Sequence, residues 1–298
     1  MRYSLLSRFR GCLLGAAVGE AFGGINKQHH LPTEWGRVMI LGAESLIRHG
    51  GFNAEDWHQA LLLFAESCQC LSSRDPLGVI VGTLPLFLFY HENEIKLRQN
   101  FLTLVDIWHD DLVSRDGALA VGYATLQSLT EKLNRATLIP LTINFLGAPS
   151  PLAQQLAQVQ TLLEQDAGLE RVVTHLSRDT QPSTPIALAF YCFLSTIEDL
   201  RLSISRAART GYQSQLTSAI TGALSGTYNS TVGIPATLRM ALSRPDVRPL
   251  AAWGMKTEAD VLELSDYLLA AWSGVYDNET HPNGFMPLAA IAAPGIIR

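Results

Sequence analysis

The sequence has few charged residues, few cysteines and no hydrophobic run long enough to cross a membrane. Asp, Glu, Lys and Arg together make up 16% of the 298 residues, whereas 47% are hydrophobic. This balance is typical of a globular protein with a large core. The net charge is −5 and no Lys/Arg block occurs, so we expect neither nucleic acid nor a membrane surface as a partner. The most apolar segment, residues 77–90, contains Pro85 and is shorter than the roughly 20 residues that span a bilayer, which favours a buried core helix.

The four cysteines give no sign of a disulfide framework or a zinc site. They are Cys12, Cys68, Cys70 and Cys192, and Cys68 and Cys70 lack the two-residue gap of the usual metal or redox pairs. We predict buried, reduced thiols. The N-terminus carries basic residues before an apolar run, as a signal peptide does, but that run is rich in glycine and soon reaches Glu20. We therefore predict a cytoplasmic protein without a signal peptide.

Alternating β patterns are scarce, and apolar residues recur three and four positions apart along most of the chain. This periodicity predicts helices within residues 38–51, 52–71, 93–109, 116–133, 151–168, 184–196, 197–210, 217–229 and 257–276. Residues 135–147 are rich in β-branched side chains and contain Pro140, so we interpret them as a possible extended linker. No repeat or clear interdomain linker is present. We predict an all-α fold, a compact single-domain helical bundle over residues 1–298.

The first helical stretch carries glycine at every fourth position, at Gly11, Gly15, Gly19 and Gly23. Each glycine inside a helix costs about 0.8–1 kcal/mol relative to alanine, so the stripe needs a reason. Residues four apart share one helix face, and bare positions there let a second helix approach closely. The segment SAITGALSG (218–226) has small residues at matching spacing. We predict that the two helices touch through Gly15, Gly19, Gly222 and Gly226, either for packing alone or to bring the adjoining loops together at a site.

Those adjoining segments resemble a known enzyme family. RFRGCLLGAAVGEAFG (8–23) resembles the N-terminal signature of the ADP-ribosylglycohydrolase family, and SRAARTGYQSQLTSAITGALSGTYNSTVGIP (205–235) resembles its C-terminal signature. Residues 39–56 resemble the helix after the family's first metal motif, and residues 184–208 the helix pair before the second. The resemblance implies an all-α fold that binds two magnesium ions between these motifs and cleaves ADP-ribose from a protein side chain or a similar acceptor.

The resemblance also implies where the metal ligands belong, and most of them are replaced. The first motif, Ser/Thr-Asp-Asp-Thr, falls on Thr33, Glu34, Trp35 and Gly36. The second, Asp-x-Asp-Thr/Ser, falls on Gln213, Ser214, Gln215 and Leu216, and the family's Gly-Asp-Ala reads Gly19, Glu20 and Ala21. Magnesium prefers charged oxygen ligands, yet four motif carboxylates have become one, and a tryptophan adds bulk. We expect no bound metal and no magnesium cofactor.

Three further groups of polar residues are weaker candidates. Glu20 and Glu34 are candidate catalytic acids, although Glu20 could equally accept hydrogen bonds at a helix end. Asp110 and Asp111, next to His109, could form a metal or acid–base cluster or simply a polar helix terminus. The pair at residues 29–30, His-His, fits a solvated or substrate-facing loop better than a metal site, because adjacent side chains on a loop rarely share one ion.

Two classes of function follow from these residues. The first is a catalytically inactive relative, a pseudoenzyme that binds ADP-ribose, a related nucleotide or a protein partner. The second is an active ADP-ribosyl hydrolase with an altered or metal-independent centre that uses Glu20, Glu34 and Asp110 or Asp111 as acid and base. Fold alone does not decide between them, because function depends on the site.

Overall fold

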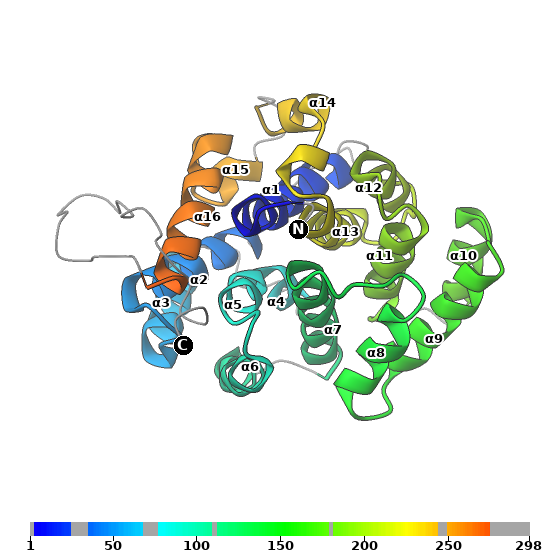
Figure 1. Cartoon of the computed structure of the whole chain (residues 1–298), viewed down its shortest axis with the longest axis horizontal. Coiled ribbons are helices and arrows are strands. Elements are labelled where there is room, and N and C mark those ends of the chain that lie inside the picture. The colour runs from blue at the N-terminus through cyan, green and yellow to red at the C-terminus, as the bar shows by residue number, and fades with distance from the viewer. Residues whose placement is uncertain are drawn as a thin grey trace.

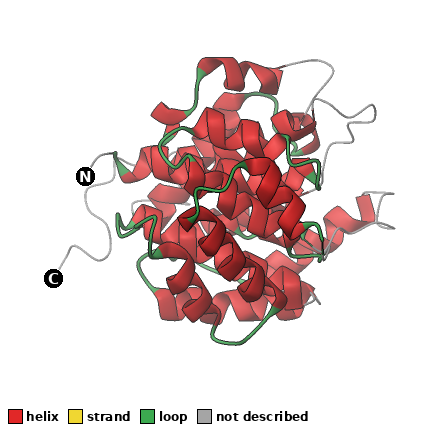
Figure 2. Cartoon of the chain, turned by 90° about the vertical axis from the view of Figure 1, so that its right-hand side faces the viewer, coloured by secondary structure: helices red, strands yellow, loops and turns green. Residues whose placement is uncertain are grey.

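All regular secondary structure in the described part of the chain is helical, which confirms the all-α prediction (Figure 2). The computed structural model describes residues 3–24, 35–67, 77–108, 112–178, 181–243 and 249–274. The helices in chain order are α1 (Leu5–Gly24), α2 (Trp35–His49), α3 (Ala54–Ser67), α4 (Gly78–Gly82), α5 (Leu84–Phe89), α6 (Glu94–Trp108), α7 (Leu112–Leu129), α8 (Leu138–Leu146), α9 (Pro151–Glu164), α10 (Leu169–Leu176), α11 (Thr184–Ser195), α12 (Leu200–Ala208), α13 (Ser214–Asn229), η2 (Thr231–Gly233), α14 (Ala236–Arg239), η3 (Met240–Ser243), α15 (Pro249–Ala252) and α16 (Glu258–Trp272).

Helices α1 and α13 form the centre of the fold and pack against each other along their whole lengths (Figure 1). Both are almost entirely buried. Helices α11 and α12 lie against α13 on one side, α16 lies against α1 on the other, and α7 also contacts α13. A helix that other helices cover on all sides has no single apolar stripe. This is why apolar and small residues occupy every face of α1.

The two central helices run antiparallel with a four-residue register. A Cβ atom placed on Gly11 would lie 2.1 Å from the carbonyl oxygen of Gly226, and one on Gly15 would lie 2.2 Å from that of Gly222. One on Gly19 would lie 2.0 Å from the carbonyl oxygen of Ser218. No side chain fits at such distances. The predicted contact of the two glycine stripes is therefore confirmed, and close backbone approach is the reason that the stripe is kept.

Arg8 joins this central pair to a neighbouring helix. Its guanidinium is buried and donates from Nη1 to the carbonyl oxygen of Ser128, 2.8 Å away, near the end of α7. Nη2 pairs with Glu131 at 2.9 Å. A cation at the C-terminal end of a helix meets carbonyl oxygens that have no partner within the helix, so Arg8 ties α1 to α7.

Two interpretations of the sequence differ from the structure. Residues 135–147 are not an extended linker, because they contain α8; Pro140 lies in its first turn, where a missing N–H costs no hydrogen bond. Residues 77–90 are buried as predicted, but they form the two short helices α4 and α5 with Thr83 between them. Pro85 has no N–H to donate. It therefore fits the first turn of α5, whereas in the interior of one continuous helix it would remove a backbone hydrogen bond.

Two helix ends have clear local causes, and the predicted buried, reduced thiols are confirmed for two of the cysteines. Asn53 caps α3 by accepting the amide hydrogen of Asp56 at 3.0 Å, and α2 ends before Gly50, whose φ is +60°. Cys12 and Cys192 are free and buried, and burial raises the pKa of each thiol to about 12. The other two cysteines, at positions 68 and 70, lie outside the described residues.

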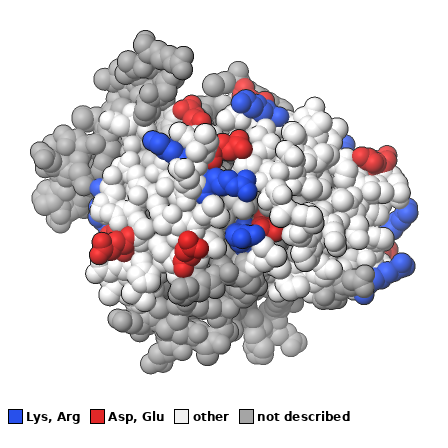
Figure 3. Space-filling view, turned by 90° about the horizontal axis from the view of Figure 1, so that it is seen from below, with Lys and Arg blue, Asp and Glu red and all other residues white. Residues whose placement is uncertain are grey.

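The surface carries few charges, as the composition predicts. On the face seen from below, acidic and basic side chains are mixed and separated by wide uncharged areas (Figure 3). Such a surface offers no extended basic area for a nucleic acid on that face. Among the described helices, none is both long enough and apolar enough to pass through a bilayer.

Candidate functional site

The end of α1 packs against the first turn of α13 and is linked to the first turn of α2 through Trp253. The resemblance places the family's two motifs at these two helix starts. At the end of α1, a Cβ atom on Gly23 would lie 2.3 Å from the carbonyl oxygen of Ser214, the first residue of α13. The Ser214 hydroxyl donates to the carbonyl oxygen of Gly23 at 2.9 Å. The glycine stripe thus positions the start of α13 beside the end of α1.

Glu20 is the buried carboxylate at this junction. It is fully shielded from solvent, and its Oε2 accepts a hydrogen bond from the indole Nε1 of Trp253 at 2.9 Å. Trp253 follows α15 and is also fully buried. Glu20 therefore accepts a hydrogen bond, as one of its two expected roles requires, and this donor is a tryptophan from a distant part of the sequence.

The start of α2 carries Trp35 and Gly36, on which the resemblance places the end of the first motif, and a tryptophan indole packs at each. Gly36 lies under the Trp253 ring, where an added Cβ atom would come within 1.8 Å of Cε2. Trp35 packs on the start of α4, where a Cβ atom on Gly78 would come within 2.1 Å of the Trp35 Cδ1 atom. Two tryptophan–glycine pairs, Trp253 with Gly36 and Trp35 with Gly78, therefore pack closely around the start of α2.

Residues 213–216, on which the resemblance places the second motif, lie at the start of α13, and the two glutamines there differ in environment. Gln213 is exposed and adopts a left-handed backbone conformation with φ +38° and ψ +51°. Asn and Asp adopt this conformation more readily than other residues with a Cβ atom. The backbone at Gln213 thus has a shape that aspartate, the residue that the resemblance implies there, adopts more readily than glutamine. Gln215 is half-buried in the first turn of α13.

The remaining predicted residues lie outside the part that the structure describes. These are His29, His30, Thr33, Glu34, His109, Asp110 and Asp111. Of the predicted residues that it describes, the structure links Glu20 to Gly36 through Trp253, whereas Trp35 packs on Gly78 of α4. It describes none of the residues in this list.

The described residues do not fit the two magnesium ions that the resemblance implies. At the motif positions they offer an indole, a bare glycine and two neutral amides, and the buried Glu20 carboxylate already accepts the Trp253 N–H. Within the described ranges, no three His, Cys, Asp or Glu side chains gather closely enough to hold a metal. Two divalent ions in a partly dry pocket need several carboxylates to offset their charge.

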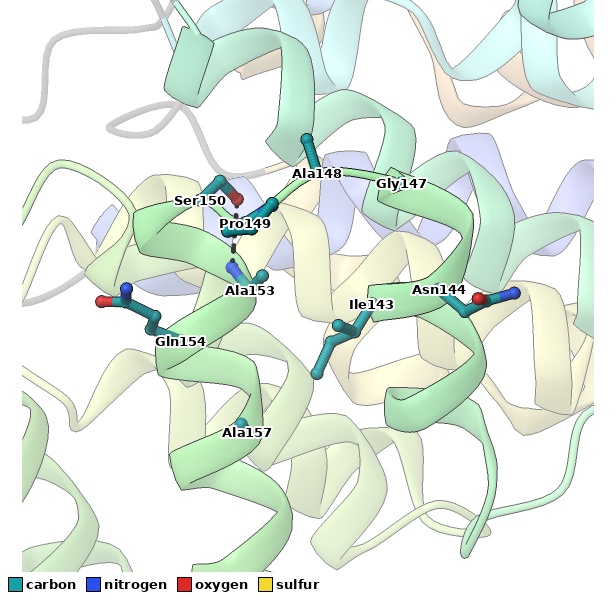
Figure 4. A pocket seen from close by; sticks show the side chains of 9 residues that line it. All are labelled: Ile143, Asn144, Gly147, Ala148, Pro149, Ser150, Ala153, Gln154 and Ala157. Atoms are coloured by element: carbon teal, nitrogen blue, oxygen red, sulfur yellow. Dashed lines mark hydrogen bonds between the residues drawn. The ribbon is translucent and has the colours of Figure 1, made fainter.

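Two surface grooves lie elsewhere. One of about 410 Å³ runs between α2 and α3 and includes Arg37, Arg48 and Asp56, of which the last two are already paired at 2.8 Å. The other, of about 450 Å³, lies between α8 and α9 (Figure 4). It is lined mainly by small apolar side chains and carries no ionisable group, so its walls offer neither an acid nor a base for catalysis.

Trp253 is the site residue that sequence reasoning missed. It lies far from both motifs in the chain, and a tryptophan after a short apolar stretch carries no distinctive pattern. The available signal was indirect. Gly36 stands where the family has a threonine, and the loss of a side chain in the first turn of a helix indicates that another group fills the space.

The comparisons with known proteins agree with this fold. A sequence model of the family described as ADP-ribosylglycohydrolase matches residues 1–276. Among solved structures, one described as an "ADP-ribosylglycohydrolase-related protein complex" is similar, with a TM-score of 0.64 and 17% sequence identity, over 90% of this chain and 99% of the other. A search of curated proteins finds no match. The extent of the family match, supported by the shared all-α fold, shows that the chain belongs to the ADP-ribosylglycohydrolase family.

Proposed function

We propose that this chain is a catalytically inactive member of the family that acts by binding. The observation that carries the proposal is the environment of the residues on which the resemblance places the metal ligands. Glu20 accepts a hydrogen bond from the Trp253 indole, whose ring lies on Gly36, and glutamines stand at both aspartate positions of the second motif. A neutral amide oxygen can contact a cation but does not offset its charge, whereas the family's chemistry depends on metal-bound hydroxyls or water.

The same arrangement is compatible with a binding function. The fold of the family is kept, the start of α13 packs on the end of α1, and Trp253 links Glu20 of α1 to Gly36 of α2. The ligand that we propose is ADP-ribose or a related nucleotide, bound without magnesium, with a protein partner as the other outcome.

The test is an ADP-ribose release assay with the unmodified protein, using acceptors modified on arginine and on serine, with and without MgCl₂. We expect no release above the protein-free control, while an active family enzyme run in parallel releases ADP-ribose. Calorimetric titration with MgCl₂ should show no binding. Titration with ADP-ribose then separates a nucleotide-binding module, which gives a saturable signal without magnesium, from a protein-binding one.

Robust turnover would overturn the proposal and support the hydrolase with an altered centre, in which Glu20, Glu34 and Asp110 or Asp111 act as acid and base. Micromolar magnesium binding that is lost in Glu34→Gln would also contradict it, because the metal centre would then still function.

A further inference from the structure

The turn that follows α15 holds Trp253 in a fixed position. The amide of Gly254 donates to the carbonyl oxygen of Ala251 at 3.0 Å, and that of Met255 donates to Leu250 at 2.7 Å. These two bonds form a Schellman motif, in which the residue after the helix cap has a left-handed conformation. Gly254 has φ +80°, as that motif requires. The backbone of Trp253, the cap residue, is therefore set by hydrogen bonds.

The indole of Trp253 is held on two further sides. Its ring lies against the backbone of Gly36, since a Cβ atom there would come within 1.8–2.0 Å of three ring atoms. Its Nε1 donates to Glu20 Oε2 at 2.9 Å, and no part of the side chain is exposed. The ring thus fills a closed space between α1 and α2, and its only polar group has a partner.

We propose that Trp253, Glu20 and Gly36 form a tryptophan plug that occupies and closes the ion position implied by the family's first motif. A side chain at position 36 and the indole at position 253 exclude each other, because their atoms would overlap. The Trp253 indole offers a cation no lone pair, and its N–H occupies an acceptor position of the buried Glu20 carboxylate. This proposal shares one assumption with the proposed function, namely that the family's first motif falls on residues 33–36.

One consequence separates the plug from the simple loss of ligands. If ligand loss alone explains the missing metal, then restoring carboxylates restores metal binding. If the plug fills the position, restored carboxylates fail until the indole is removed. The structure favours the second outcome, because the space at Gly36 is already taken.

The first experiment measures coupling between positions 36 and 253 by urea unfolding. Gly36→Thr alone should lower the unfolding midpoint strongly, and it should lose most of that effect in a Trp253→Ala background. In a Trp253→Phe background, which keeps a ring but no N–H, the cost of Gly36→Thr in unfolding midpoint should stay large.

Gly78→Ala is the matched control, because its added methyl group meets Trp35 and not Trp253. The stability cost of Gly78→Ala should therefore not depend on the residue at position 253. Additive effects of Gly36→Thr and Trp253→Ala would overturn the interlock. If Gly36→Thr does not fold, Gly36→Ala replaces it in the same cycle.

The second experiment measures the ion position itself by the magnesium-dependent change in melting temperature. The variant Glu34→Asp, Trp35→Asp, Gln213→Asp, Gln215→Asp should show no such change with Trp253 intact. The same variant with Trp253→Ala and Gly36→Thr should melt at a higher temperature in MgCl₂, because a ligand that binds only the folded state stabilises it. Equal stabilisation with and without the indole, or none in either, would overturn the plug. Turnover by the unmodified protein would instead refute the proposed function, so the two failures are distinguishable.

Discussion

At the scale of single residues, His91 couples the core to pH. Its side chain is 3% exposed, and Nδ1 donates to the carbonyl oxygen of Leu88 at 2.7 Å. The ring lies edge-on to Phe9 of α1 and 4.8 Å from the Trp272 ring of α16, measured between centroids. Burial lowers the pKa of His91 below its ordinary value of 6.5, against smaller opposing effects of the bond to Leu88 and the charge of Glu92. The imidazole is therefore neutral in the folded protein at neutral pH.

This shift predicts a loss of stability in acid. The unfolded chain binds a proton at His91 near pH 6.5, whereas the folded chain binds it only at lower pH, so the unfolded state holds more protons between the two values. The free energy of unfolding should not vary with this group above about pH 7 and should fall as pH decreases from 6.5 toward the lowered pKa. Urea unfolding at a series of pH values measures this.

The substitution His91→Gln removes the titrating group and should reduce the acid dependence, although it also costs stability at every pH through lost packing. The control is His58→Gln, because His58 is an exposed residue of α3. An unchanged pH slope in His91→Gln, or an equal reduction in His58→Gln, would contradict the assignment.

At the scale of secondary structure elements, the α1–α13 contact is where a single methyl group has the largest expected effect. Gly15→Ala gains about 0.8–1 kcal/mol of helix propensity, but its Cβ atom would lie 2.2 Å from the carbonyl oxygen of Gly222. Backbone cannot move aside as a flexible side chain can, and overpacking of this kind typically costs about 1–3 kcal/mol or more. We therefore expect net destabilisation for Gly15→Ala and a larger loss for Gly15→Leu.

The matched control is Gly168→Ala. Gly168 precedes α10 with φ −67°, and no atom lies within 4 Å of the position of an added Cβ atom. This variant should differ from the parent by less than about 1 kcal/mol, because alanine is a poorer N-cap for α10 than glycine but reduces the entropy of the unfolded chain. Thermal and urea unfolding of the three variants provide the measurement. A Gly15→Ala protein as stable as Gly168→Ala would show that the helices are further apart than described.

Helices whose apolar or small residues recur at regular spacing could be predicted from the sequence. Features that depend on contacts with distant parts of the chain could not. The α1–α13 pairing was readable, because both helices present small residues every fourth position and glycine has few other reasons to recur so regularly. The helix α8 was missed, because Pro140 and β-branched residues suggest extended chain when position within the helix is unknown. A proline breaks a helix interior but fits its first turn.

The candidate site also contains features with a local sequence pattern and features that depend on long-range contacts. The placement of the ligand positions on Trp35, Gln213 and Gln215 stays a prediction from local resemblance, which can be made because each motif is contiguous in the sequence. The contact of Glu20 with Trp253 joins residues 233 positions apart, and it depends on a Schellman turn and on the bare backbone of Gly36. No local pattern encodes such a contact, since packing decides it.

At the scale of the whole molecule, two buried thiols report on whether distant parts of the chain unfold together. Cys12 lies in α1 and Cys192 in α11, and both helices pack against α13. The buried hydrophobic side chains of α1, α7, α11, α13 and α16 belong to one continuous cluster. If this cluster forms one cooperative unit, exposure of either thiol requires the whole core to open.

Alkylation in increasing urea, read peptide by peptide in a mass spectrometer, tests this cooperativity. Burial raises the pKa of both thiols to about 12, and the thiolate is the reactive form, so neither peptide should be labelled in the native protein at neutral pH. Both should then become labelled with the same urea midpoint, equal to that of global unfolding measured by circular dichroism. Separate peptides keep the signals of Cys68 and Cys70 from entering the measurement. Gly15→Ala should shift the midpoints of both peptides to lower urea by the same amount, because it weakens the contact between α1 and α13, on which α11 also packs. A shift confined to Cys12, or two distinct midpoints in the parent protein, would mean that the N-terminal helix opens independently and that residues 1–298 do not unfold as the single domain predicted from the sequence.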